Sequence, residues 1–206
     1  MFKRVLSLGF SAALLLAPMS GVAQAPAQQD DMTQTVQQVR RQLLGLTNYG
    51  VFDSLHFAIK GHTIILEGYA SRPTLKSDAE RAVKGIKGVN SVDNQIVVLP
   101  NSPNDDRIRA EVYRRIYTQP ALRRYSGSSY GFGRAPSVAR AAGGITVDPP
   151  IGYHAIHIIV NNGNVILKGV VDSEMDSNIA TIQANLAPGA FSVDNDLDIR
   201  SAGQKK

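Results

Sequence analysis

The side chains best suited to chemistry in this chain are four histidines, and their spacing does not form a site. They are His56, His62, His154 and His157, and the chain has no cysteine. His154 and His157 lie three residues apart in a predicted strand, where successive side chains alternate between faces, so they point to opposite faces. A protein zinc site needs three or four nitrogen, sulfur or carboxylate ligands. The sequence therefore predicts no metal site and no cofactor.

Motifs of catalytic centres are also absent from the sequence. The chain contains no G-x-S-x-G, no H-E-x-x-H and no phosphate-binding loop. Residues 194–198 (DNDLD) resemble the start of a calcium loop, but the glycine and the distal glutamate of such a loop are missing. We therefore predict a protein that is not an enzyme.

Arginine and aromatic residues are concentrated in the middle of the chain. Residues 107–140 contain eight arginines and one acid, Glu111, with tyrosines and Phe132 between the arginines. Guanidinium groups bind phosphate in a bidentate manner, and aromatic rings suit a membrane interface. Single-stranded nucleic acid would use the same chemistry, but the export signal described below argues against it. This pattern favours an anionic partner, although a solvated loop would show it too.

A second basic surface is predicted on the helix that begins at Pro73. Its cations lie on an arc beside the apolar stripe and are interrupted by Glu80. A solvated helix face is the alternative interpretation. Together the two regions give the candidate lipid-binding residues Lys76, Arg81, Lys84, Lys87, Arg123, Arg124, Arg134 and Arg140.

The first 25 residues have the layout of a secretory signal peptide. Lys3 and Arg4 are followed by an apolar run of about a dozen residues and then by small residues, and this run is too short to span a membrane. We expect residues 26–31 to be a short leader. Without cysteine the exported chain has neither disulfides nor a lipid-anchoring thiol, so we expect a soluble periplasmic protein.

The remainder of the chain contains one pattern twice. Residues 51–70 align without a gap with residues 152–171, and S-V-D-N recurs at 91–94 and 192–195. Internal repetition of this length indicates two small domains of one type. We place them at residues 32–100 and 104–200, followed by a tail at 201–206.

Each copy is predicted to fold in the order helix, strand, strand, helix, strand. Leu55, Phe57 and Ile59 alternate with polar residues as in a half-buried strand. In the second copy Asp105 or Asp106 is the expected cap of the first helix. The apolar stripe of its second helix is Met175, Ile179, Ile182 and Leu186, one residue out of step with the first copy, which implies a compensated deletion and insertion. Residues 118–151 are predicted to be a flexible basic insertion.

Alternation along the strands also predicts an apolar patch on the sheet face away from the helices. Its candidate interface residues are Ile65, Ile159 and Ile166. Such patches commonly mark contacts between proteins. The two copies, a second chain or a client protein could cover it.

The two copies resemble the BON domain. The pattern V-x-x-G/N-x-V-x-L-x-G occurs in Val160–Gly169 and, with Ile59 first, in Ile59–Gly68, and G-V-x-x-V-x-N occurs in Gly88–Asn94. The second copy has Ala190 where valine is usual. The resemblance implies an α+β protein with two αββαβ domains, each a three-stranded mixed sheet with two helices on one face. Tandem copies behind a signal peptide resemble OsmY-type periplasmic proteins.

That resemblance implies phospholipid binding, envelope maintenance under osmotic or other stress, and in some members assistance to folding. Our leading hypothesis is therefore a non-catalytic envelope protein that binds an anionic surface, most simply phospholipid headgroups or another envelope polyanion. The alternative is a periplasmic folding helper or protein-interaction module with protein clients. Self-association is left open, and nucleic acid is not expected as a partner.

Overall fold

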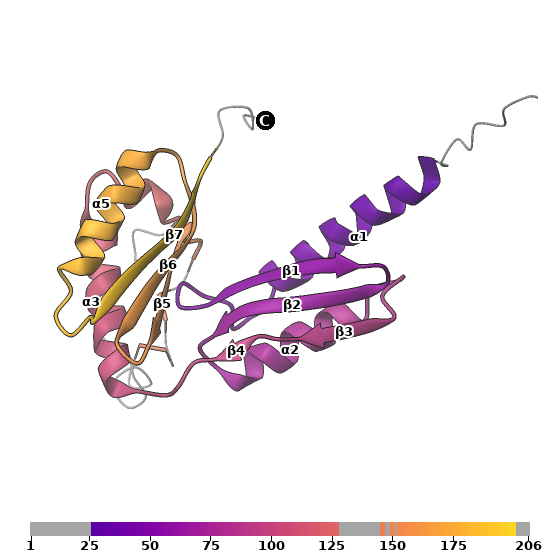
Figure 1. Cartoon of the computed structure of the whole chain (residues 1–206), viewed down its shortest axis with the longest axis horizontal. Helices are drawn as coiled ribbons and strands as arrows, with labels where there is room; N and C mark the ends of the chain where they lie inside the picture. Colours follow the sequence, from indigo (N-terminus) through magenta and orange to yellow (C-terminus); the bar gives the residue numbers. More distant parts are fainter. Residues whose placement is uncertain (1–25, 128–144, 147–148, 151, 201–206) are drawn as a thin grey trace, which may run out of the picture.

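The structure is a computed structural model that describes residues 26–127, 145–146, 149–150 and 152–200 (Figure 1). The predicted signal peptide, most of the predicted insertion and the tail lie outside these residues. The elements of domain 1 are α1 (Pro26–Leu44), β1 (Ser54–Lys60), β2 (Thr63–Ala70), α2 (Pro73–Lys84), β3 (Ser91–Asn94) and β4 (Val97–Val98). Those of domain 2 are α3 (Pro103–Thr118), the short 3-10 helix η1 (Arg123–Tyr125), β5 (Ile156–Asn161), β6 (Asn164–Val171), α5 (Glu174–Asn185) and β7 (Ser192–Ile199).

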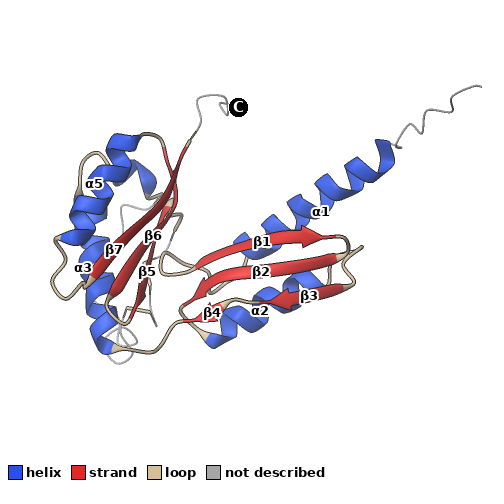
Figure 2. Cartoon of the chain, viewed as in Figure 1, coloured by secondary structure: helices blue, strands red, loops and turns tan. Residues whose placement is uncertain are grey.

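Both domains have the predicted αββαβ arrangement, with the helices on one face of a mixed sheet (Figure 2). β1 pairs antiparallel with β2, which pairs parallel with β3 and β4; β5, β6 and β7 repeat this topology. The last strand of domain 1 is divided into β3 and β4, whereas its counterpart β7 is continuous, although the equivalent asparagines Asn94 and Asn195 accept matching hydrogen bonds from the Ile96 and Leu197 amides (3.3 and 3.2 Å). The predicted fold class is confirmed.

Gly68 and Gly169 explain why the repeat keeps a glycine at the same point of its second strand. Their φ angles are +116° and +127°, a region that L side chains rarely adopt. A Cβ atom at Gly169 would lie 1.9 Å from the Ala155 carbonyl oxygen, and one at Gly68 would lie 2.0 Å from that of Ser54. These glycines allow the first two strands to approach each other and have a structural role.

Three local predictions need correction. α1 begins at Pro26, so the leader predicted at 26–31 is part of a helix. α3 is capped by Ser102, whose hydroxyl accepts a hydrogen bond from the Asp105 amide (3.2 Å), because the chain enters the helix earlier than predicted. The start of the predicted flexible insertion is ordered, since Leu122 and Tyr125 are buried in the core of domain 2.

The orientation of α5 is the largest difference from the sequence prediction. The residues that face the core are Asp176, Ala180, Ala184 and Ala187. They match Leu75, Ala79, Val83 and Ile86 of domain 1 at the same offset as the rest of the repeat, so no deletion or insertion is present. Three residues of the predicted core stripe lie on the outside instead, with exposed fractions of 71% for Met175, 57% for Ile182 and 55% for Leu186. The fourth, Ile179, is partly buried and packs against the core of domain 2.

Tyr125 explains why a carboxylate can occupy the core position that leucine has in domain 1. The Tyr125 hydroxyl donates to Asp176 (2.9 Å) and accepts from the Asp172 amide (2.7 Å). Burial raises the pKa of Asp176, but hydrogen bonds from Ser173 and Tyr125 and the charge of Arg124 outweigh burial and leave this pKa lowered. Tyr125 belongs to the predicted insertion, and its ring packs beneath the start of α5. Its hydroxyl helps to keep the Asp176 carboxylate ionised.

The two domains share a core through one loop. Val51 and Phe52 precede β1 of domain 1, yet they pack in the hydrophobic core of domain 2. The Val51 carbonyl accepts a hydrogen bond from the Ile158 amide on the free edge of β5 (2.8 Å), and the Phe52 ring meets Tyr113 of α3 edge-on. Asp53 fixes this loop by accepting from the Gly50 and Ser71 amides (2.9 and 2.6 Å).

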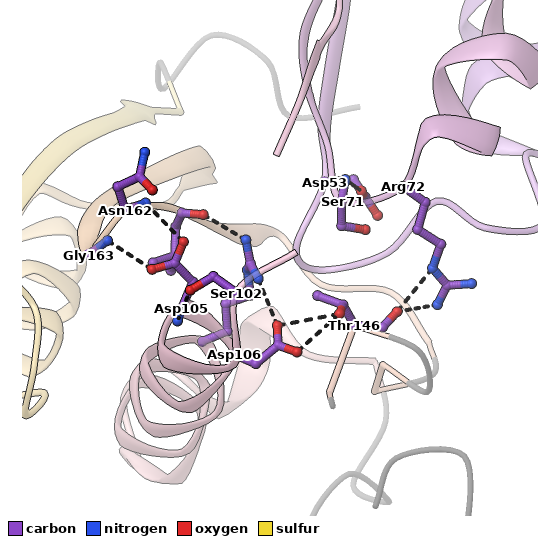
Figure 3. Close-up of polar contacts among 11 residues, drawn as sticks. Asp53, Ser71, Arg72, Ser102, Asp105, Asp106, Thr146, Asn162 and Gly163 are labelled. Atoms are coloured by element: carbon purple, nitrogen blue, oxygen red, sulfur yellow. Dashed lines mark hydrogen bonds and ion pairs between the residues drawn. The ribbon is translucent and has the colours of Figure 1, made fainter. Parts of the chain in front are cut away.

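A polar network adds a second link between the domains (Figure 3). Arg72 of domain 1 donates to the carbonyl of Thr146, whose hydroxyl donates to Asp106 (3.3 Å). Asp106 in turn pairs with the buried Arg109 (2.7 Å), which also donates to the Val160 carbonyl (2.6 Å). The link therefore runs from Arg72, the residue before α2 of domain 1, through Thr146 of the insertion into the first turn of α3.

The orientation of α5 predicts opposite effects for two substitutions on the same helix. Ala180 is fully buried, so A180L should overpack the contact with the sheet and cost about 1–3 kcal/mol of unfolding free energy. Met175 is exposed, so M175S should change that free energy by no more than about 0.5 kcal/mol. Urea unfolding followed by circular dichroism measures both, and a larger loss for M175S than for A180L would contradict this orientation.

The shared core predicts that a substitution in domain 1 destabilises domain 2. F52A should cost about 3–5 kcal/mol because Phe52 is 1% exposed. Amide hydrogen exchange should then accelerate at Ile158 and along β5, whereas V97A, at an exposed position of β4, should leave β5 unchanged. Acceleration confined to domain 1 would show that the loop is not part of the domain 2 core.

Candidate functional site

The outward side of α5 is the main apolar surface that the helices of domain 2 present. Met175, Ile179, Ile182 and Leu186 recur every three or four residues and so lie on one side of the helix. Ile179 is partly buried and the other three are exposed. α3 and α5 lie on the side of domain 2 that faces away from domain 1 (Figure 1), so this stripe is not part of the contact between the domains.

Arginines of α3 and η1 border the α5 stripe. Arg107 lines a shallow depression of about 400 Å³ with Pro188 and Gly189, just after the end of α5. At the other end of α5, Arg124 pairs with Asp176 (2.5 Å). α3 and α5 therefore run side by side in opposite directions, with cations near both ends of the stripe. We group the α5 stripe with exposed arginines of the neighbouring α3 and η1 under the name helix face of domain 2; the group comprises Arg107, Arg114, Arg123, Met175, Ile179, Ile182 and Leu186.

The charges on this face are partly compensated. Glu111 pairs with Arg114 (2.6 Å) and Arg115 (2.7 Å), and these arginines hold its pKa below the usual range despite the opposing effect of burial. Arg107 donates to the neutral side chain of Asn104 (3.0 Å) and is exposed, as is Arg123. Glu174 is an exposed acid at the start of α5. The face therefore combines a strong apolar component with a modest positive charge.

The candidate lipid-binding residues predicted in the insertion have different environments. Arg124 forms ion pairs with Asp176 and Asp172 (2.5 and 3.4 Å) and lies over the Tyr125 ring, which identifies a structural role. Arg123 is exposed beside it. Arg134 and Arg140 lie outside the described residues.

The predicted basic arc of α2 belongs to a different part of the molecule. Arg81, Lys84 and Lys87 are exposed and Lys76 is partly buried. Arg81 pairs with Asp78 (3.1 Å). Since α2 covers the sheet of domain 1, the structure does not bring this arc together with Arg123 and Arg124 (Figure 1).

The predicted interface residues lie on the sheet faces away from the helices, but with unequal exposure. Ile159 is fully buried and belongs to neither hydrophobic core. Ile65 and Ile166 are partly buried. Near Ile159 on the same strand, His157 contacts the Tyr49 ring and the Gly50 carbonyl of domain 1. This part of the β5 surface therefore lies next to the loop that joins the domains.

The histidines form no chemical site in the described part of the chain. His154 is buried against Tyr113 and Tyr117, with its Nε2 atom 3.0 Å from the Tyr113 hydroxyl. His157 and His56 lie on matching strands, and burial lowers the pKa of both. Among the described residues no group of histidines and acids is placed to hold a metal ion.

None of the described helices has the length and apolar character needed to cross a membrane.

Sequence reasoning missed the helix face of domain 2 because it assigned the α5 stripe to the core. A signal was available in the repeat itself. The spacing from Gly68 to Gly88 in the first copy equals the spacing from Gly169 to Gly189 in the second. The helix between these glycines could therefore shift by one residue only if a deletion on one side were balanced by an insertion on the other. The ungapped alignment places alanines inward and the stripe outward, as observed.

Burial of His154 predicts that acid destabilises the fold. Burial lowers its pKa to about 4, whereas an unfolded histidine titrates near 6.5. Between these values the unfolded state binds more protons, so the unfolding free energy should fall as pH drops from about 6.5 to 4, by at most about 3 kcal/mol from this group. Urea unfolding at several pH values measures this slope, and H154Q should flatten it. Identical slopes for the two proteins would contradict the burial of a neutral His154.

Comparison with known proteins identifies the family. A comparison with curated proteins finds no match. Among solved structures, the chain resembles CdsD, a structural protein of the type III secretion system of Chlamydia trachomatis, at 12% identity and a TM-score of 0.27 over 82% of this chain and 94% of that one. The C-terminal domain of CdsD gives 12% identity and a TM-score of 0.25 over 81% and 97%. TM-scores this low carry no argument. The sequence model described as BON domain matches residues 30–100 and 140–201, more than half of the chain, and the protein therefore belongs to the BON domain family.

Proposed function

We propose that this protein is a non-catalytic, periplasmic envelope protein that binds an anionic phospholipid surface through the helix face of domain 2. One observation carries the proposal: α5 turns its alanines to the core and exposes Met175, Ile182 and Leu186. Membership of the BON domain family supports an envelope-associated role without catalysis. The layout of residues 1–25 supports export.

The exposed stripe has the properties of a helix that lies in a membrane interface. α5 spans 12 residues, about 18 Å, and its apolar side chains form one continuous line. Helices of this kind lie flat with the apolar side about 5–10 Å into the headgroup region. Complete burial of Leu, Ile or Met is worth about 1.5–3 kcal/mol, so each half-exposed side chain would contribute about 1 kcal/mol. Insertion of three of them would provide weak, reversible binding.

The arginines would give the surface its preference for anionic lipid. Arg107 is exposed beside the residues that follow α5, and Arg123 is exposed next in sequence to Arg124, which pairs with Asp176 at the start of α5. A guanidinium group suits the binding of a phosphate. A basic residue near an anionic membrane contributes about 1 kcal/mol, and salt screens this attraction within a Debye length of about 10 Å. Glu174 opposes it. Binding should therefore contain a large apolar part that salt leaves intact and a smaller ionic part that salt removes.

Vesicle co-sedimentation with paired variants tests this function. The double variant M175S/I182S should bind phosphatidylglycerol-containing vesicles about 30-fold more weakly at every salt concentration, since it removes about 2 kcal/mol of apolar contact. R107S/R123S should bind about 30-fold more weakly at low salt and much like the wild type at high salt. V97S, at an apolar position of domain 1 that is 48% exposed, is the matched control and should bind normally.

Two outcomes would remove the proposed function. Wild-type chain that sediments with neither anionic nor neutral vesicles would exclude membrane binding. Unchanged binding of M175S/I182S would exclude the helix face of domain 2 as the site, and loss on replacing Lys84 and Lys87 would then assign binding to α2 instead.

A further inference from the structure

Domain 1 has an open groove where domain 2 has a filled one. The groove lies between α1 and the free edge of β1, has a volume of about 550 Å³ and is lined mainly by Val36, Leu43, Leu44, Leu55, Phe57 and Ile59. This volume lies within the range of about 300–1,000 Å³ that is usual for ligand sites. Leu55, His56 and Phe57 are consecutive, so the groove follows the edge of the strand as well as its helix-facing side.

The same place in domain 2 is occupied by Val51 and Phe52 of domain 1. By the repeat alignment, β1 residues Leu55, Phe57 and Ile59 correspond to Ile156, Ile158 and Val160 of β5, and all three of the latter belong to the same hydrophobic core as Val51 and Phe52. The Phe52 ring meets Tyr113, which corresponds to Arg40 at the rim of the open groove. Tyr117 likewise corresponds to Leu44, which is 63% exposed.

The hydrogen bond from the Ile158 amide to the Val51 carbonyl holds the loop in the filled groove of domain 2, and the equivalent amide in the open groove of domain 1 is that of Phe57. Val51 accepts a hydrogen bond from the Ile158 amide at the free edge of β5. Phe57 is the equivalent residue of β1, and β1 is likewise an edge strand. In the described part of the chain no backbone group outside β2 pairs with β1. At this edge the Leu55 backbone is hydrogen-bonded by the Tyr49 hydroxyl, as the Ile156 backbone is by Tyr117 in domain 2, and Phe57 is the next outward-facing position. A strand edge beside an apolar groove is the arrangement that binds extended peptides by strand addition.

We infer that the groove between α1 and β1 binds an extended segment of another polypeptide that carries an aliphatic residue followed by an aromatic one. The aliphatic residue's carbonyl accepts from the Phe57 amide, and the aromatic ring enters the groove beside Leu44. The occupant's chemistry is taken from Val51–Phe52 in the homologous groove. This inference does not rest on the proposed function, because the groove lies in domain 1 and the helix face lies in domain 2.

A peptide with the sequence of residues 47–54 (TNYGVFDS) is the probe that tests this inference. It should bind the full chain with saturable fluorescence anisotropy, and the same peptide with Ser-Ser in place of Val-Phe should bind at least about tenfold more weakly. Hydrogen exchange at the Phe57 amide should slow when the peptide binds, which non-specific apolar contact would not produce.

Two variants locate the site and separate it from membrane binding. L44E should weaken peptide binding at least about tenfold and leave vesicle binding unchanged, and the exposure of Leu44 means that the substitution should not unfold the chain. M175S/I182S should weaken vesicle binding and leave peptide binding unchanged. The pair therefore distinguishes failure of this inference from failure of the proposed function.

Several results would overturn the inference. Equal binding of the two peptides, no binding of either, or unchanged exchange at Phe57 would each do so. Loss of vesicle binding in L44E would assign the groove to a lipid chain. If the chain dimerises, L44E abolishes the dimer and the peptide does not compete with it, the groove would be an interface between two copies that does not use the strand addition inferred here.

Discussion

The structure depends on Phe52, which belongs to domain 1 by sequence and to domain 2 by packing. Its burial closes the side of domain 2 where α3 meets the edge of β5, and the bond from Ile158 to Val51 aligns the two domains. Asp53 holds the loop in place by accepting hydrogen bonds from the Ser71 and Gly50 amides. These bonds lower the pKa of its carboxyl, but the effect of burial is larger and the pKa is raised. A repeat that could have been two independent domains is in this way joined into one packed unit.

The same contact explains why the two copies expose different surfaces. Domain 2 receives Phe52 on one side and Tyr125 beneath the start of α5, so its core is filled from outside the αββαβ repeat. Alanines then suffice on the inner side of α5, and large apolar side chains become available on its outer side. Domain 1 receives no such segment in the described residues, and its groove beside α1 stays open. One unit therefore presents an apolar helix and the other an apolar groove.

Much of the fold could be predicted from the sequence, because the relevant signals are local. Alternation of Leu55, Phe57 and Ile59, the Asn162-Gly163 turn and the second-strand glycines identify the hairpins, and the spacing between copies identifies the repeat. For α5 the apolar periodicity and the repeat spacing predict different core faces, and the structure follows the repeat spacing. Periodicity shows that a stripe exists but not which way it faces when another segment fills the core.

Contacts between distant segments could not be predicted in this way. Nothing in the neighbourhood of Val51 and Phe52 shows that they pack against α3, since the equivalent residues of the second copy, Gly152 and Tyr153, have no such role. Of the candidate site, the sequence predicted Arg123 as a surface cation but not the apolar part of the helix face of domain 2, and the predicted cations of α2 lie elsewhere in the molecule.

The central claim is that the exposed stripe of α5 meets the membrane, and a single label tests it most directly. The chain has no cysteine, so I182C can carry one environment-sensitive fluorophore, with V97C as the matched site in domain 1. We predict a blue shift and quenching by lipid-borne quenchers at position 182 when anionic vesicles are added, and no change at position 97. An unchanged spectrum at position 182 under conditions where the chain sediments with vesicles would contradict the claim.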